Sequence, residues 1–221
     1  MKTIKDIRDE FVLKLSNEEY VVDKTGVKTI EIVGAQFKAD QDVIFGTLNT
    51  EYAERELAWY KSQSLSVNDI PEPVPEIWKK VASTTGMINS NYGWCIWSKD
   101  NYSQFENVLR ELITNPDSRR AQMIYTRPSI WVDYNKEGMS DFICTTAVQY
   151  FIRENRLVTY VTMRSGDAVF GYKNDVFWQK YVADIISRRL GIICGDVIWN
   201  VASLHVYERH FYLVKDYGTR I

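Results

Sequence analysis

Apolar residues recur at helical spacing in four parts of the chain, and each part predicts an amphipathic helix. The predicted helices cover residues 3–16, 50–62, 102–114 and 174–190. The clearest apolar stripe belongs to the third helix and consists of Phe105, Val108, Leu109, Leu112 and Ile113. This helix ends at Asn115-Pro116, because a residue that precedes proline disfavours helical backbone angles. Gly191 is placed to end the last helix.

Runs rich in β-branched and aromatic residues predict the strands. They cover residues 28–38, about 121–126, 142–152, 156–163 and 196–208. A turn at Lys24-Thr25-Gly26 precedes the first strand, and the polar pair Glu154-Asn155 joins two of the others. Because helices and strands follow no strict alternation, the pattern favours an α+β fold with helices packed on a sheet. The proline-rich stretch 71–75 is interpreted as a rigid loop, so we expect one domain over residues 1–221.

The composition is that of a globular protein, with 45% hydrophobic and 25% charged residues. A formal net charge of −2 argues against broad binding of nucleic acid, so any anion must be bound by a local cluster. The N-terminus lacks the apolar core of a signal peptide, and no run approaches the roughly 18 apolar residues of a membrane span. We therefore expect a soluble, cytoplasmic protein that binds neither nucleic acid nor membranes.

The cysteines and histidines exclude two further classes of site. Three widely spaced cysteines (Cys95, Cys144 and Cys194) form no disulfide framework and favour a reducing compartment. The two histidines, His205 and His210, are too few to suggest zinc, so we expect no metal.

Cys144 is the first candidate for catalytic chemistry. A cysteine in a strand is more often a small core residue, and a nucleophilic one needs positive charge nearby. The arginines Arg119 and Arg120 and the segment Arg164-Ser165-Gly166-Asp167 could supply that charge. Adjacent arginines can also grip a phosphate through bidentate hydrogen bonds, although a solvated pair is the commoner case.

Glu56 lies on an aromatic face of the second predicted helix. Its neighbours at helical spacing are Tyr52, Trp59 and Tyr60. A desolvated glutamate there would have a raised pKa and could serve as a general acid or base. Periodicity gives equal weight to the alternative, in which Glu56 points into solvent.

Three polar residues near the C-terminal half remain open to two interpretations. Asp175 starts the long predicted helix, where an aspartate commonly complements the helix dipole. His205 and Tyr207 are two residues apart in a strand and so face the same side. They could hydrogen-bond a hydroxylated ligand or form a satisfied polar edge.

Eight short motifs occur in an order that resembles the thymidylate synthase family. They are Asp-Lys-Thr-Gly, Arg-Glu-Leu-Ala-Trp-Tyr, Asn-Tyr-Gly, Asp-Ser-Arg-Arg, the cysteine segment, Arg-Ser-Gly-Asp, Phe-Gly-x-x-x-Asp and Leu-His-Val-Tyr. The motifs extend from about residue 20 to 212, and Arg164 follows Cys144 by 20 residues, as the family requires.

The resemblance implies a homodimer in which the mixed β-sheet under the helices also forms the dimer interface. It assigns the phosphate to Lys24, Arg164 and Ser165 of one subunit and to Arg119 and Arg120 of the other. His205 and Tyr207 would hold the deoxyribose hydroxyl, and Trp78 and Asp167 would line a pocket for the co-substrate 5,10-methylenetetrahydrofolate.

Asp175 implies the base that is recognised, because thymidylate synthases carry asparagine at this position. Cytosine with a protonated N3 presents two adjacent donors, and a carboxylate accepts from both better than an amide does. The stretches 22–32, 88–94, 115–120 and 203–207 are most similar to the phage branch of the family, whose members modify deoxycytidylate. The implied reaction starts with attack of Cys144 on C6 of dCMP. A one-carbon unit is then transferred to C5 and water, organised by Glu56, is added to give 5-hydroxymethyl-dCMP.

Two departures from the family pattern bear on this activity. Thr145 stands where the family usually has histidine, and the chain ends at Ile221, which suggests a shortened tail over the folate. The alternatives are a thymidylate synthase, an enzyme that hydroxymethylates CMP, or a scaffold or nucleic-acid-binding module without catalysis. The last is disfavoured because Cys144, Glu56, Asp175 and the basic residues are all present.

Overall fold

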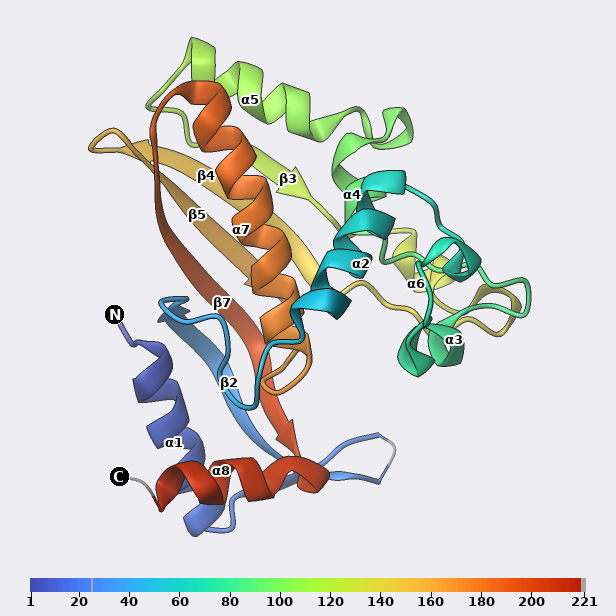
Figure 1. Ribbon diagram of the computed structural model, residues 1–221, viewed down its shortest axis with the longest axis vertical. Coiled ribbons are helices and arrows are strands. Elements are labelled where there is room, and N and C mark those ends of the chain that lie inside the picture. Colours follow the sequence, from blue (N-terminus) through green and yellow to red (C-terminus); the bar gives the residue numbers. More distant parts are fainter. Residues whose placement is uncertain (25, 220–221) are drawn as a thin grey trace. The chain divides into compact units, whose positions relative to one another are not determined.

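The computed structural model describes residues 1–24 and 26–219, so Thr25 of the predicted turn lies outside the described residues. Figure 1 shows the chain, which forms two compact units. Met1–Leu48 and Glu154–Ile221 make the first, named here the sheet unit, and Asn49–Arg153 make the second, the inserted unit. A single domain over the whole chain stays a prediction.

The described residues of the sheet unit form three α-helices, one 3₁₀ turn and five strands. Its elements are α1 (Ile4–Ser16), β1 (Tyr20–Val22), β2 (Lys28–Lys38), β5 (Arg156–Met163), β6 (Gly166–Asp167), α7 (Gly171–Leu190), β7 (Ile193–Tyr207), the short 3₁₀ turn Glu208–His210 and α8 (Phe211–Gly218). The strand order is β1-β2-β7-β5, and β6 pairs with β7. Strand β2 runs antiparallel to β7, whereas β5 and β6 run parallel to it. The predicted α+β class with a mixed sheet is therefore confirmed.

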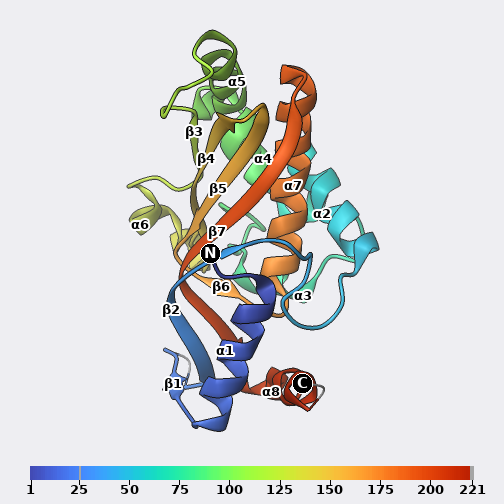
Figure 2. The ribbon, with the colours of Figure 1, turned by 90° about the vertical axis from the view of Figure 1, so that its left-hand side faces the viewer.

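Helices α1, α7 and α8 lie on the same face of this sheet (Figure 2). Helix α1 begins with a capping box between Thr3 and Asp6 and buries the predicted stripe that starts at Ile4. Helix α7 ends at Gly191, whose φ of 67° permits the left-handed cap that the sequence predicts. The core of the unit lies between these helices and the sheet.

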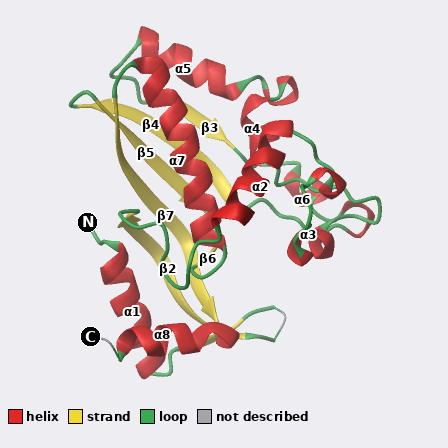
Figure 3. Ribbon diagram, in the orientation of Figure 1, coloured by secondary structure: helices red, strands yellow, loops and turns green. Residues whose placement is uncertain are grey.

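The inserted unit combines short helices with a pair of strands (Figure 3). Its elements are α2 (Thr50–Ser62), α3 (Glu76–Val81), α4 (Tyr92–Trp97), α5 (Gln104–Thr114), β3 (Gln122–Ile124), α6 (Ile130–Asp133), β4 (Thr145–Arg153) and the 3₁₀ turns Val67–Asp69, Lys99–Asn101 and Lys136–Gly138. Helices α2 and α4 meet at Gly93, where an added Cβ would lie 1.8 Å from the Tyr60 carbonyl oxygen. Only glycine permits this approach.

Two expectations about these elements are wrong. Ile113 is 61% exposed, because it lies at the edge of the α5 stripe and the other four residues cover the core. Cys144 lies in a bend just before β4 and not within a strand, since Asp141, three residues earlier, is hydrogen-bonded to Asn89 and Ser90 instead of joining a ladder.

Helix α7 starts three residues earlier than predicted, which places Asp175 in its second turn. The start is set by Asp167, whose carboxylate accepts hydrogen bonds from the backbone N–H groups of Val169 (2.7 Å) and Phe170 (3.2 Å). Asp175 therefore does not complement the helix dipole in the first turn, and that interpretation is wrong.

Candidate active site

Glu56 projects from α2 into the interior of the inserted unit and is only 6% exposed. Tyr52 Oη and Trp78 Nε1 both donate hydrogen bonds to its Oε1, at 2.7 Å and 3.2 Å. Burial raises the pKa of Glu56 to about 7, and the two hydrogen bonds oppose this rise. The buried alternative is thus the correct one, and Glu56 can take up or release a proton near neutral pH.

Trp78, on α3, belongs to the surroundings of Glu56. Its indole packs edge-on against Trp59, with ring centroids 5.2 Å apart, while the side chain remains half-buried. The structure brings Trp78 and Glu56 together, which the sequence did not predict. The role of Trp78 in a folate pocket stays a prediction.

Cys144 is the half-buried thiol among three different cysteine environments. Its Sγ lies 3.9 Å from the carbonyl oxygen of Phe142. Cys95 is buried and its pKa is raised to about 12 by desolvation, whereas Cys194 is exposed at the start of β7. A nucleophile needs access to its substrate, and Cys144 combines that access with a fixed backbone.

Arg119 and Arg120 lie in the exposed turn that follows α5. Arg120 donates from Nε and Nη2 to Glu111 Oε1 (3.2 Å and 3.1 Å), and Arg119 accepts at its carbonyl oxygen from Gln149 Nε2 (2.6 Å). Gln149 is five residues beyond Cys144, or about 17 Å along the strand at about 3.4 Å per residue. The Arg119 carbonyl therefore lies beside the middle of β4, whereas Cys144 lies just before its first residue.

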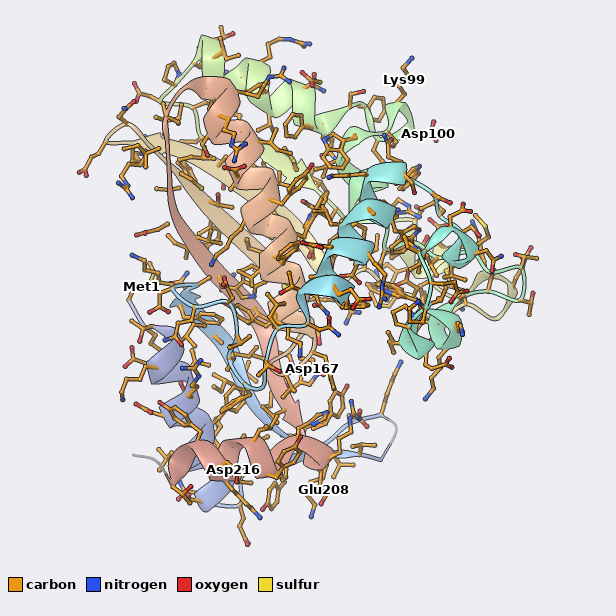
Figure 4. The ribbon with its side chains drawn as sticks, viewed as in Figure 1. Met1, Lys99, Asp100, Asp167, Glu208 and Asp216 are labelled. Carbon is orange, nitrogen blue, oxygen red and sulfur yellow. The ribbon has the colours of Figure 1, made fainter. Side chains whose placement is uncertain are left out.

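The sheet unit brings several predicted residues to the end of β5 and β6. Arg164 and Ser165 follow β5, and Asp167 of β6 is the register partner of His205 in β7. The rings of His205 and Tyr207 are 5.0 Å apart, which confirms that both residues face the same side of the strand. Figure 4 shows Asp167 at the N-terminal end of α7, beside β7.

Asp175, in the second turn of α7, lies close to this group because it approaches Gly171 in the first turn. A Cβ added at Gly171 would lie 3.5 Å from Asp167 Cβ and 3.7 Å from Asp175 Oδ2, so the two aspartates flank this glycine. Asp175 is half-buried.

Lys24 lies in the exposed turn before β2. Thr29, at the start of β2, pairs with Tyr207 of β7.

Asp141 and Glu111 are polar residues that sequence reasoning missed. Asp141 is 7% exposed and bonds residues 51 and 52 positions earlier in the chain. Glu111 accepts from Ser118 Oγ (2.6 Å) as well as from Arg120, and these contacts lower its pKa. Neither contact follows a helical or strand period, so no local pattern could have revealed it.

The residues that the structure describes offer neither a metal site nor a membrane-spanning helix. No group of three or more His, Cys, Asp and Glu side chains is arranged to hold a metal ion there. No helix in that part of the chain combines the length and the apolar character that crossing a bilayer requires.

Comparison with known proteins identifies the family. A family model described as thymidylate synthase matches residues 10–220. The chain is 58% identical over 219 residues to the deoxycytidylate 5-hydroxymethyltransferase of Enterobacteria phage T4, covering 96% of this chain and 89% of that protein, and the phage T2 and T6 proteins match equally. It is 26% identical to a thymidylate synthase of Francisella philomiragia, with coverage of 90% and 78%.

A solved structure supports the fold independently. Thermostable thymidylate synthase A from Bacillus subtilis superposes with a TM-score of 0.72 at 24% identity, covering 94% of this chain and 82% of that one. The predicted family and fold are confirmed, and the predicted activity is the one in the name of the phage relatives. The chain belongs to the thymidylate synthase family.

Proposed function

We propose that this chain is a deoxycytidylate 5-hydroxymethyltransferase that converts dCMP, 5,10-methylenetetrahydrofolate and water into 5-hydroxymethyl-dCMP and tetrahydrofolate. The observation that carries the proposal is the 58% identity over 96% of the chain to a phage enzyme of that name. The half-buried thiol of Cys144 and the buried carboxylate of Glu56 are the groups that such a reaction needs.

The covalent step belongs to Cys144. Its thiolate adds to C6 of the cytosine ring, and the electron pair of the C5–C6 double bond moves toward C5. The carboxylate of Asp175 accepts hydrogen bonds from N4 and from protonated N3, which selects cytosine and draws electrons away from C6. Loss of the C5 proton after carbon–carbon bond formation expels tetrahydrofolate and leaves an exocyclic methylene at C5. Water adds to this methylene carbon, and expulsion of the Cys144 thiolate from C6 restores the C5–C6 double bond and the aromaticity of the ring.

Glu56 is the group that exchanges a proton with the attacking water. A pKa of about 7 leaves comparable amounts of both protonation states at neutral pH. Its Oε1 already accepts from Tyr52 and Trp78. The proton is therefore exchanged at Oε2, and the two donors hold that atom in one direction.

The folate co-substrate supplies a one-carbon unit at the oxidation level of formaldehyde. Trp78 offers a half-buried indole face on which a flat pterin ring can stack, and Asp167 offers a carboxylate beside the start of α7. An aromatic ring and a carboxylate suit a folate, so we assign Trp78 and Asp167 to the folate site.

The phosphate site is proposed to be shared between two copies of the chain. Lys24, Arg164 and Ser165 would act in one subunit, with Arg119 and Arg120 donated by the other. Both arginines are exposed in the turn that follows α5, which supports donation to a second subunit. The proposed interface is the sheet face opposite α7, where Val33 is 78% exposed. We propose the host cytoplasm of an infected cell as the compartment, consistent with three cysteines that form no disulfide with one another.

Release of tritium from C5 tests the reaction and its base specificity. The wild-type chain should release tritium from dCMP faster than from CMP or dUMP, and Asp175→Asn should shift preference toward dUMP. Faster release from dUMP by the wild type would overturn the base assignment. Cys144→Ser should reduce release to background, and retained activity would remove Cys144 from the mechanism.

Mixing two inactive variants tests the shared phosphate site. Arg119→Ala and Cys144→Ser subunits should together recover up to about a quarter of the wild-type activity, because a mixed dimer holds one intact site. Absence of any recovery, in dimers shown to exchange subunits, would contradict donation across the interface.

A further inference from the structure

We propose that Asp141 is a positioning residue that fixes the backbone carrying Cys144 against the segment 89–92, which leads into α4. The inference rests on the proposed role of Cys144 as nucleophile. It concerns a buried carboxylate that plays no part in the reaction described above.

The carboxylate of Asp141 binds two consecutive backbone amides and one hydroxyl. Its Oδ2 accepts from the N–H groups of Asn89 (2.7 Å) and Ser90 (2.8 Å), and its Oδ1 accepts from Ser90 Oγ (2.6 Å). The side chain of Asn89 completes the link, because its Nδ2 donates to the Asp141 carbonyl oxygen at 3.0 Å. Four hydrogen bonds thus join two segments that are about 50 residues apart in sequence.

A second link lies on the other side of Cys144. Thr145, the next residue, is fully buried and its Oγ1 donates to Tyr92 Oη at 3.0 Å. The Asp141 and Thr145 contacts therefore bracket Cys144, three residues before it and one residue after it. Both contacts reach the same short segment, so the position of the thiol is tied to residues 89–92.

The same segment is fastened to the helix that carries Glu56. Tyr92 stacks on Tyr60 of α2 with ring centroids 5.2 Å apart. Asn91 Nδ2 donates to the Trp59 carbonyl oxygen at 3.0 Å, and Gly93 permits close contact with the Tyr60 backbone. Residues 89–93 consequently set the nucleophile and the acid/base residue relative to each other, and Asp141 is the charged group that secures this arrangement.

Substitution of Asp141 separates its hydrogen-bonding role from its mere presence in the core. Asp141→Ala leaves two buried N–H groups without their acceptor, which is the costly change. Asp141→Asn keeps one oxygen for both backbone donors and can donate to the Ser90 hydroxyl, so it should rescue part of the function. Asp133→Asn is a control in the same unit, because Asp133 is also held by several donors (Arg127, Ser129 and Lys136) but reaches Asn89 only indirectly, through Arg127, which donates to Asn89 Oδ1 at 2.8 Å.

Steady-state kinetics with dCMP, with C5 tritium release as the signal, is the first experiment. Asp141→Ala should lower kcat about 100-fold, because a misplacement of about 1 Å costs this much, while KM for dCMP changes less than about threefold. Asp141→Asn should lower kcat about tenfold and Asp133→Asn less than about twofold. A kcat within threefold of wild type in Asp141→Ala, an effect on KM alone, or an equal loss in Asp133→Asn would overturn the proposal.

Hydrogen exchange keeps this inference distinct from the proposed function. In the full chain, Asp141→Asn and Asp141→Ala should speed amide exchange in peptides that cover 89–92 and 141–145, and leave α5 unchanged. This result is expected even if the wild-type chain releases no tritium from dCMP, an outcome that would count against the proposed function only. Unchanged exchange in both peptides would overturn the positioning role, and Asp141→Asn provides the reading should Asp141→Ala fail to fold.

Discussion

Two carboxylates of the inserted unit, Glu56 and Asp133, occupy opposite electrostatic environments. Glu56 is 6% exposed and accepts from the neutral donors Tyr52 and Trp78, and its pKa is raised to about 7. Asp133 accepts from Lys136 Nζ (2.6 Å), Arg127 Nε (3.0 Å) and Ser129 Oγ (2.8 Å), and its pKa is lowered to about 2.

Desolvation outweighs the two hydrogen bonds at Glu56, whereas the hydrogen bonds from Lys136, Ser129 and Arg127 outweigh desolvation at Asp133. Burial without a cation favours the neutral form of Glu56, whereas two cations and a side chain that is 15% exposed favour the charged form of Asp133. A carboxylate that exchanges protons at neutral pH is produced by keeping cations away from it. A carboxylate that anchors a loop, such as Asp133, is produced by placing cations beside it.

The largest expected effect concerns turnover. Glu56→Gln should lower kcat for 5-hydroxymethyl-dCMP formation by about 10²–10⁴-fold, because the amide cannot exchange the proton. Product formation measured by chromatography checks this value, with Asp133→Asn as a control that should stay within about twofold of wild type. A Glu56→Gln enzyme within threefold of wild type would remove Glu56 from proton transfer.

The same substitution should stabilise the fold at alkaline pH. A folded pKa of about 7 lies above the ordinary 4.5, so the stability linked to Glu56 is fully present below pH 4.5 and is lost as pH rises through 7. Glu56→Gln should therefore raise the free energy of unfolding by on the order of 3 kcal/mol at pH 8 relative to pH 5. Urea denaturation at both pH values tests this sign. A variant whose free energy of unfolding, relative to wild type, is no higher at pH 8 than at pH 5 would contradict it.

Removal of a neutral donor should move the pKa of Glu56 upward. Tyr52 donates to the carboxylate and thereby lowers its pKa, so Tyr52→Phe should shift the corresponding limb of the kcat–pH profile to higher pH by about one unit. Trp78→Phe removes the longer bond and should shift the limb less. A downward shift in either variant would show that the lost hydrogen bond does not lower the pKa of Glu56.

The smallest effect concerns Asp133. Its folded pKa of about 2 lies below the ordinary 3.8, so its contribution is present above pH 3.8 and is lost as pH falls through 2. Asp133→Asn should lower the free energy of unfolding by about 1 kcal/mol at pH 7, since solvent screens this partly exposed cluster. The difference from wild type should vanish near pH 2, and a difference that persists there would not come from ionisation.

The local pattern of the sequence accounts well for the existence of the main elements. Helix α1 buries the predicted stripe from Ile4, and β2 and β5 have the predicted ends. These features depend on periodicity within one segment, which is visible in the residues themselves. The ends of β4 and α7 were predicted less well, because Asp141 and Asp167 set them through hydrogen bonds to other backbone groups.

The residues of the candidate site also fall into those that local motifs reveal and those that only long-range contacts reveal. The order of motifs identified Cys144, Asp175 and the paired arginines, since residue types and spacings persist along the chain. Asp141 has no such signature, because it bonds a segment about 50 residues away. The engagement of Arg120 by Glu111 could not be inferred either, as both residues look like ordinary surface charges.

By itself the sequence determined which chemical groups this protein has available: a thiol, Cys144, among the motifs proposed to bind phosphate, an aspartate at the position proposed to select the base and a glutamate among aromatic residues. Only the tertiary structure decided the state of those groups. It buried Glu56 against the neutral donors Tyr52 and Trp78, left Cys144 half-buried just before β4 and placed the Arg119 backbone beside the middle of that strand. The physical reason is that pKa and reach depend on which distant side chains surround a group, and the folded chain alone brings these together.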